Sequence, residues 1–96
     1  MLTNSDIENK LRALKPFLSE KYFVKRIGYF GSFSRGEQTE ESDIDILVEF
    51  RQPLGWEFFD LQEFLEDELK LNVDLVSTKA LKQQLKETIL SQTRYV

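Results

Sequence analysis

The sequence contains no cysteine and no histidine. The absence of cysteine excludes disulfides, zinc fingers, iron–sulfur clusters and thiol nucleophiles. The absence of histidine excludes a serine–histidine–aspartate triad and removes the usual zinc ligands. Any metal site must therefore be built from oxygen ligands, which favours Mg²⁺, Mn²⁺ or Ca²⁺.

Basic residues and long apolar runs are also scarce. Thirteen Lys and Arg against seventeen Asp and Glu give a net charge of −4. Non-specific nucleic-acid binding depends on an excess of Lys and Arg, so we expect no direct binding to nucleic acid. No apolar run approaches the roughly 20 residues that span a bilayer, and no signal peptide is visible. The sequence therefore predicts a soluble cytoplasmic protein without membrane contact.

The chain is long enough for one folded domain. Its 96 residues predict a single domain over 1–96, which buries somewhat more than about 60% of its unfolded surface. Hydrophobic residues make up 41% of the sequence and include eight Phe, which is enough for one core. Internal repeats, low-complexity tracts and an interdomain linker are all missing from the sequence.

The hydrophobic pattern predicts alternating helices and strands. The first helix should begin with a capping box at Ser5–Glu8 and should kink or restart at Pro16. Strands are expected over 23–30, 44–50 and 72–77, and further helices over 54–70 and 79–92. A short helical turn is expected after the first strand. The order α-β-(short helix)-β-α-β-α predicts an α/β or α+β domain, a small mixed sheet with helices against it.

Between the first two strands lies a polar segment, GSFSRGEQTEESDID, from Gly31 to Asp45. Gly31 and Ser32 directly follow the first strand. A glycine there lets the backbone approach a ligand closely, and the amides of a following turn, with a serine hydroxyl, form an anion site. Because Gly-Ser after a strand is more often an ordinary turn, this pair alone does not identify a site.

Three aspartates stand in apolar surroundings. Asp43 and Asp45 are two residues apart, so on a strand both carboxylates project from the same face. They could simply face solvent at a strand edge, but a carboxylate enclosed by Ile44, Ile46 and Leu47 is costly unless it is paired or binds a cation. Asp74 repeats this pattern in the last strand. If the two strands are neighbours, three carboxylates converge on one face and form a candidate site for Mg²⁺ and phosphate.

These residues resemble a known family. Gly31-Ser32, ten intervening residues and Asp43-x-Asp45 match the pattern G-S-x10-D-x-D of the DNA polymerase β-like nucleotidyltransferase superfamily. The run GSFSRGEQTEESDIDILVEF is similar to the minimal nucleotidyltransferases (MNT) of prokaryotes, which pair with HEPN-domain toxins. The resemblance extends over nearly the whole chain, including the expected helices and the strand NVDLVS with its single acid.

The resemblance implies a fold and a set of residue roles. The fold would be the polymerase β-like nucleotidyltransferase fold. Gly31 and Ser32 would hold the β- and γ-phosphates of a nucleoside triphosphate, and Arg35 would lie near these phosphates. Asp43 and Asp45 would ligate two Mg²⁺ ions. Asp74 would bind one of them and help to deprotonate the attacking hydroxyl. The reaction would transfer NMP, expected to be AMP from ATP, and release pyrophosphate.

The resemblance also implies a partner. In HEPN/MNT pairs the MNT protein is the antitoxin, and the expected acceptor is a tyrosine of the HEPN toxin, with which the protein could form an oligomer. Two alternatives stay open. The chain could be a non-catalytic antitoxin or binding module that neutralises its partner by occlusion, or a transferase that modifies a small molecule.

Three further features have simpler explanations. The aromatic residues of the helix expected over 54–70 predict core packing with a partly covered rim, and a partner interface is the alternative. They are Trp56, Phe58, Phe59 and Phe64. The lysines between Lys79 and Lys86 are too sparse to indicate nucleic-acid binding. Arg94 and Tyr95 are assigned no element and are expected to lie in a frayed terminus.

Overall fold

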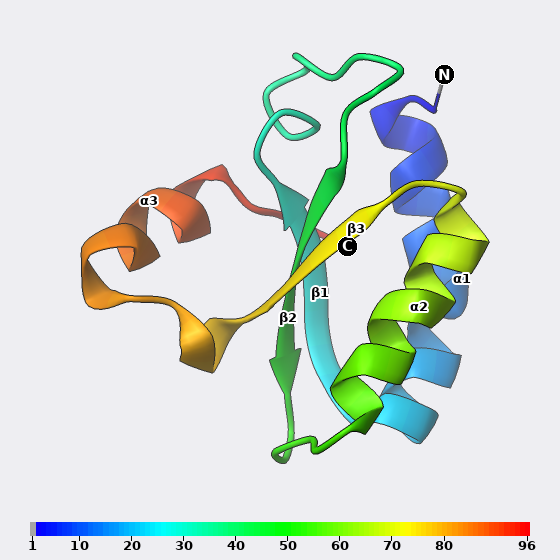
Figure 1. Cartoon of the computed structure of the whole chain (residues 1–96), viewed down its shortest axis with the longest axis vertical. Coiled ribbons are helices and arrows are strands. Elements are labelled where there is room, and N and C mark those ends of the chain that lie inside the picture. The colour runs from blue at the N-terminus through cyan, green and yellow to red at the C-terminus, as the bar shows by residue number, and fades with distance from the viewer. Residues whose placement is uncertain (1) are drawn as a thin grey trace.

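A four-stranded mixed sheet forms the centre of the structure, a computed structural model that describes residues 2–96 (Figure 1). Its strands are β1 (Val24–Phe30), β2 (Ile44–Phe50), β3 (Val73–Ser77) and β4 (Arg94–Tyr95). The helices are α1 (Asn4–Tyr22), α2 (Glu57–Leu69), α3 (Gln83–Gln92) and the short 3₁₀ helix η1 (Thr78–Ala80). The predicted α+β class, with helices against a small mixed sheet, is confirmed.

The strand order is β3-β2-β1-β4. β1 runs antiparallel to both β2 and β4, whereas β2 and β3 are parallel and are joined through α2. Two consecutive parallel strands need such a crossover, because the chain must return to the starting end of the sheet before the second strand begins. The apolar sequence of β2 predicts an interior strand, and the order confirms it.

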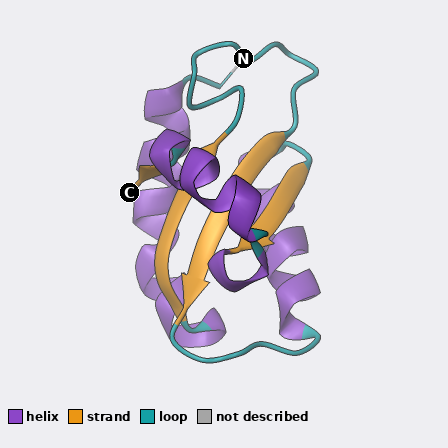
Figure 2. Ribbon diagram, turned by 90° about the vertical axis from the view of Figure 1, so that its left-hand side faces the viewer, coloured by secondary structure: helices purple, strands orange, loops and turns teal. Residues whose placement is uncertain are grey.

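Helices α1 and α2 cover one face of the sheet, and α3 lies on the other side (Figures 1 and 2). The core between α1, α2 and the sheet includes Ile44, Ile46 and Val48 of β2. Because side chains alternate along a strand, Asp45 and Leu47 face the opposite way, toward the side of α3. The alternation of side chains along β2 therefore places Asp45 outside the main core.

The first helix differs from its prediction at two points. The capping box is formed by Thr3 and Asp6: the Asp6 amide donates to the Thr3 hydroxyl at 3.1 Å, and the Thr3 amide donates to the Asp6 carboxylate at 2.9 Å. The predicted box at Ser5–Glu8 is therefore wrong by two residues. A restart at Pro16 is also wrong, because α1 continues through it, with buried Leu11 and Leu18 on either side holding the helix against the sheet.

The capping geometry predicts different effects for two neighbouring substitutions. Thr3→Ala removes a side chain that satisfies an otherwise unpaired amide, which should lower the free energy of unfolding by about 1 kcal/mol. Ser5→Ala, at an exposed position inside the helix, should change it by less than about 0.5 kcal/mol. Urea unfolding followed by circular dichroism measures both. A larger loss of stability in Ser5→Ala than in Thr3→Ala would contradict the observed cap.

The C-terminal region is also organised differently from the prediction. The single helix expected over 79–92 is divided into η1 and α3. The terminus is not frayed: Tyr95 pairs with Gly28, and Arg94 pairs with Tyr29, so that β4 extends the sheet. The Arg26 guanidinium lies 4.4 Å from the centroid of the Tyr95 ring. A two-residue strand is too short to show an alternating pattern in the sequence. Among residues 2–96, no helix has the length and apolar character needed to span a membrane.

Candidate active site

The segment after β1 folds into a series of turns over residues 31–36, where a short helix was expected. The Arg35 amide donates to the Gly31 carbonyl at 3.2 Å, and the Glu37 amide donates to the Ser32 carbonyl at 2.9 Å. Phe33 is 1% exposed and joins the core, which fixes the turn to the sheet. The Ser34 hydroxyl donates to the Gly31 carbonyl at 2.9 Å. The turn is therefore anchored, although it is not a helix.

The first amides of this turn have no protein acceptor. Within residues 2–96, the amides of Ser32, Phe33 and Ser34 take part in no hydrogen bond as donors. The first N–H groups of a helical turn are the ones left unpaired, and consecutive amides of this kind form anion-binding sites. The turn thus has the donors that the sequence predicted for a phosphate site at Gly31-Ser32.

The two strands that carry acids lie side by side, as the sequence required. Asp45 of β2 is in register with Asp74 of β3 on one side and with Phe30 of β1 on the other. Asp45 is half-buried, and Asp74 is exposed. Asp43 directly precedes β2 and is exposed as well. The structure therefore brings Asp45 and Asp74 together across adjacent strands, with Asp43 at the entrance of β2.

Gly31 and Asp45 are in close contact. Gly31 has φ +72°, a conformation that side chains rarely adopt. A Cβ atom at this position would overlap Oδ2 of Asp45 and would lie 3.1 Å from its Cγ. Glycine is therefore required both by the backbone conformation and by the space that the carboxylate occupies. The contact joins the turn over residues 31–36 directly to Asp45.

The surroundings of Asp45 favour its neutral form. Burial is the largest cause, and the neighbouring charge and hydrogen bond of Asp74 come next; together with the charge of Asp43 they raise the pKa of Asp45 to about 6. The Arg35 guanidinium acts in the opposite direction. All three acids and Arg35 are thus close enough to affect one carboxyl group. A cation would remove the conflict between these like charges.

This raised pKa predicts a dependence of stability on pH. Between about pH 4 and pH 6 the folded protein binds more protons than the unfolded chain, so Asp45 lowers stability as the pH rises through that window. Because solvent screens the half-buried group, Asp45→Asn should raise the free energy of unfolding at pH 7.5 by about 1 kcal/mol. The gain should shrink below pH 4. Thermal unfolding at several pH values measures it.

The matched control for this experiment is Asp67→Asn. Asp67 is an exposed acid of α2 on the other face of the sheet. Its replacement should change stability by less than about 0.5 kcal/mol at either pH. An equal gain in both variants would show that lower net charge, and not the local surroundings of Asp45, is the cause.

Arg35 makes contacts that the sequence did not predict. Its Nε donates to Glu37 at 2.6 Å, and its Nη1 donates to the Gln92 side chain of α3 at 3.2 Å. Arg35 thus links the turn over residues 31–36 to the end of α3. Gln92 could not be found from the sequence, because it lies 57 residues away and belongs to no recognisable motif.

The acidic residues are not preassembled around a metal position. In the described part of the chain, no three acidic side chains are grouped closely enough to hold an ion as they stand. Asp43 and Asp74 are exposed, and the like charges of neighbouring carboxylates disfavour a tight cluster without a cation. Metal binding here would require the three side chains to come closer together.

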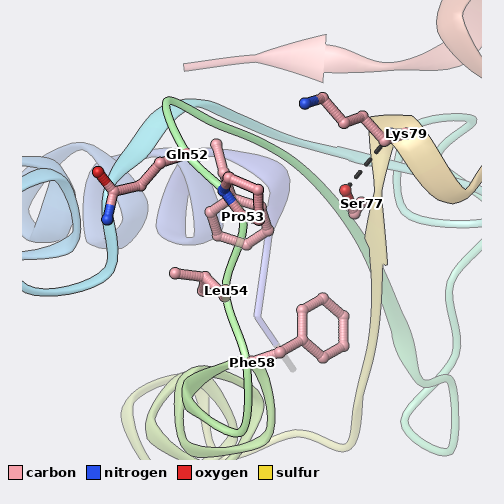
Figure 3. A pocket seen from close by; sticks show the side chains of 7 residues that line it. Gln52, Pro53, Leu54, Phe58, Ser77 and Lys79 are labelled. Atoms are coloured by element: carbon pink, nitrogen blue, oxygen red, sulfur yellow. Dashed lines mark hydrogen bonds between the residues drawn. The ribbon is translucent and has the colours of Figure 1, made fainter.

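A separate hollow lies at the opposite end of β2 and β3 (Figure 3). This pocket of about 230 Å³ is lined mainly by apolar side chains from β2, the following loop and α2; its lining is Phe50, Gln52, Pro53, Leu54, Phe58, Ser77 and Lys79. Its walls carry no acid. It therefore has no part in the acidic site at the other end of these strands.

Residues 11–96 match the nucleotidyltransferase domain family. The chain belongs to this family. Its similarity to the protein adenylyltransferase MntA of Thermococcus cleftensis is 46% identity, over 100% of this chain and 98% of the relative. The motif from Gly31 to Asp45 is thus part of a nucleotidyltransferase, and the chain is an enzyme of this kind.

Solved structures agree with this assignment. A candidate minimal nucleotidyltransferase superposes with a TM-score of 0.84 at 29% identity, covering 97% of this chain and 95% of that one. A toxin–antitoxin structure with AMP-PNP has a TM-score of 0.71 at 29% identity, covering 98% of this chain and 72% of that one. A tri-AMPylated HEPN toxin of Shewanella oneidensis in complex with an MNT antitoxin has a TM-score of 0.65 at 25% identity, covering 91% of this chain and 67% of that one. The minimal nucleotidyltransferase fold of this chain is therefore confirmed.

Proposed function

We propose that this nucleotidyltransferase is an Mg²⁺-dependent protein adenylyltransferase. It transfers AMP from ATP to a tyrosine hydroxyl of a HEPN-domain toxin and thereby acts as the antitoxin. The observation that carries the proposal is the Asp45–Asp74 pair, with Asp45 in contact with the turn at Gly31. The adenylyltransferase name of the relative, and the AMPylated toxin in the MNT complex, support the donor and the acceptor.

The turn binds the nucleotide. The free amides that follow Gly31, together with the Ser32 hydroxyl, donate hydrogen bonds to the β- and γ-phosphates. Arg35 contributes positive charge near the same oxygens, and to do so it exchanges its bond with Glu37 for a phosphate. The contact between Gly31 and Asp45 fixes the position of the phosphates relative to the acids.

The three acids fit a binuclear Mg²⁺ site by their chemistry. Carboxylate oxygens are the ligands that Mg²⁺ prefers, and the like charges around Asp45 favour an added cation. Asp43 and Asp45 would hold both ions, and Asp74 would hold one of them. When bound, Mg²⁺ offsets the negative charge that develops on the attacking and leaving oxygens.

Asp74 acts on the acceptor. It is exposed at the edge of the acidic pair, so an incoming hydroxyl can reach its carboxylate. Asp74 accepts the hydroxyl proton, and the acceptor oxygen forms a bond to the α-phosphorus as the bond between the α-phosphorus and its bridging oxygen breaks. The products are the AMP ester of the acceptor and pyrophosphate.

The test is a transfer reaction with ATP, Mg²⁺ and a HEPN-domain toxin as the acceptor, with modified residues located by mass spectrometry. We expect AMP on a tyrosine of the partner, and its loss with Asp43→Asn or with excess EDTA. Glu41→Gln removes the same charge two residues earlier and should keep activity. A tight complex without transfer would replace the proposal with the occlusion mechanism.

Two earlier expectations stay predictions. A single domain over residues 1–96 follows from length and composition. A cytoplasmic location is the second.

A further inference from the structure

One face of the sheet is less covered than the other. Helices α1 and α2 close one face of the sheet, and Asp45 faces the other. The helix on that open side is α3 (Figures 1 and 2). The bond between Arg35 and Gln92 joins the end of α3 to the turn over residues 31–36. An acceptor protein that approaches over this face comes close to α3.

Helix α3 presents an apolar side chain that the rest of the chain leaves uncovered. Every residue from Lys82 to Thr88 is exposed, and Leu85 is 53% exposed. The spacing of Leu81, Leu85 and Ile89 is that of an amphipathic helix, which predicts a packed stripe. The sequence thus has the pattern of a packing helix, whereas the structure leaves the centre of that stripe open to solvent.

The charge of this region is opposite to that of the rest of the chain. Residues 78–96 contain four Lys and Arg and one acid, whereas residues 1–77 contain nine Lys and Arg and sixteen acids. Lys82, the N-cap residue of α3, is three residues before Leu85 and four before Lys86, so its position borders both of them on the helix surface. The result is an exposed apolar side chain bordered by positive charge, on the helix whose last residue, Gln92, contacts Arg35.

We propose that α3 is the docking surface for the acceptor protein, and that the acceptor presents an acidic surface with an apolar centre beside its target hydroxyl. The identity of the occupant rests on the proposed function. A small apolar contact surrounded by complementary charge aligns a partner and excludes wrong ones. The surface thereby selects which protein is modified.

Binding to the HEPN protein, measured by calorimetry without ATP, tests this surface directly. The double variant Lys82→Glu/Lys86→Glu should weaken Kd at least about 10-fold, because it places like charges against the partner. The matched control, Arg12→Glu/Lys21→Glu, reverses two exposed charges of α1 on the other face and should change Kd less than about 2-fold. Circular dichroism checks that both variants are folded.

A second pair of variants tests the apolar centre. Leu85→Ser should weaken Kd by about 10-fold, whereas Phe59→Ser should leave it unchanged. Phe59 is similarly exposed, at 59%, but belongs to the acidic helix α2. Weaker binding in Phe59→Ser alone would place the interface on α2 and overturn the proposal.

The remaining outcomes separate the surface from the chemistry. Wild-type affinity in both α3 variants, or no binding by the wild-type protein, overturns the docking surface. Self-association that is lost with Lys82→Glu/Lys86→Glu would make a second copy the occupant and also overturn it. Binding through α3 without transfer of AMP retains the surface and refutes the proposed function. Transfer of AMP with unchanged Kd in the variants refutes the docking surface and retains the proposed function.

Discussion

Gly31→Ala should reduce AMP transfer by at least about 100-fold while leaving the protein folded. The added Cβ overlaps Oδ2 of Asp45, so the carboxylate has to move out of its position beside the turn. A misplacement of about 1 Å in an active site can cost a factor of this size. The backbone conformation adds a stability loss of about 1 kcal/mol, because φ is +72°. Steady-state transfer rates and urea unfolding measure the two effects separately.

Gly36→Ala is the matched control. Gly36 lies in the same turn and has nearly the same backbone conformation, with φ +71°, but a Cβ there would meet no atom within 4 Å among the described residues. It should show the same loss of stability and keep activity within about 3-fold. If both variants lost activity equally, strain in the turn would be the cause, and the contact between Gly31 and Asp45 would have no special role.

Asp45→Asn should lower the transfer rate by at least about 1,000-fold. The substitution removes the most buried of the three proposed metal ligands, and the loss of one preorganised charge at a reacting phosphate typically has effects of this order. The fold should remain, because the flanking Ile44 and Ile46 are fully buried in the core. Rates at saturating ATP and partner, with Asp67→Asn as control, measure the effect.

The same substitution should make the protein more stable at neutral pH, since it removes the repulsion that raises the pKa of Asp45. Opposite changes in activity and stability are typical of functional sites, where a local conflict is kept for the sake of chemistry. Added Mg²⁺ should raise the melting temperature of the wild-type protein and have little effect on Asp45→Asn. Loss of activity together with loss of stability would indicate a structural role for Asp45.

The sequence alone was sufficient to find the acidic pair. Asp45 and Asp74 each interrupt an apolar strand, and this local anomaly is visible without any knowledge of the neighbouring strands. Their register across β2 and β3 then follows from the parallel pairing of the strands that carry them. Gly31 was predicted for a close approach to a ligand, and the structure adds that it also makes room for Asp45.

Other features depend on tertiary contacts that leave no local pattern. The bond from Arg35 to Gln92 joins two exposed side chains that are distant in sequence. Strand β4 exists because its two residues meet β1, and its own sequence has no strand-like alternation. The openness of Leu85 was missed because the spacing of apolar residues shows that a helix has an apolar side and does not show what covers it.

The most direct test of the central claim is the fate of individual phosphates of ATP. The wild-type protein is incubated with Mg²⁺, the HEPN partner and ATP labelled in either the α- or the γ-phosphate. Attack on the α-phosphorus predicts label on the partner only from α-labelled ATP, with the γ-label released in pyrophosphate. Label on the partner from γ-labelled ATP, or from neither, would contradict a nucleotidyl transfer at the site formed by Gly31, Asp45 and Asp74.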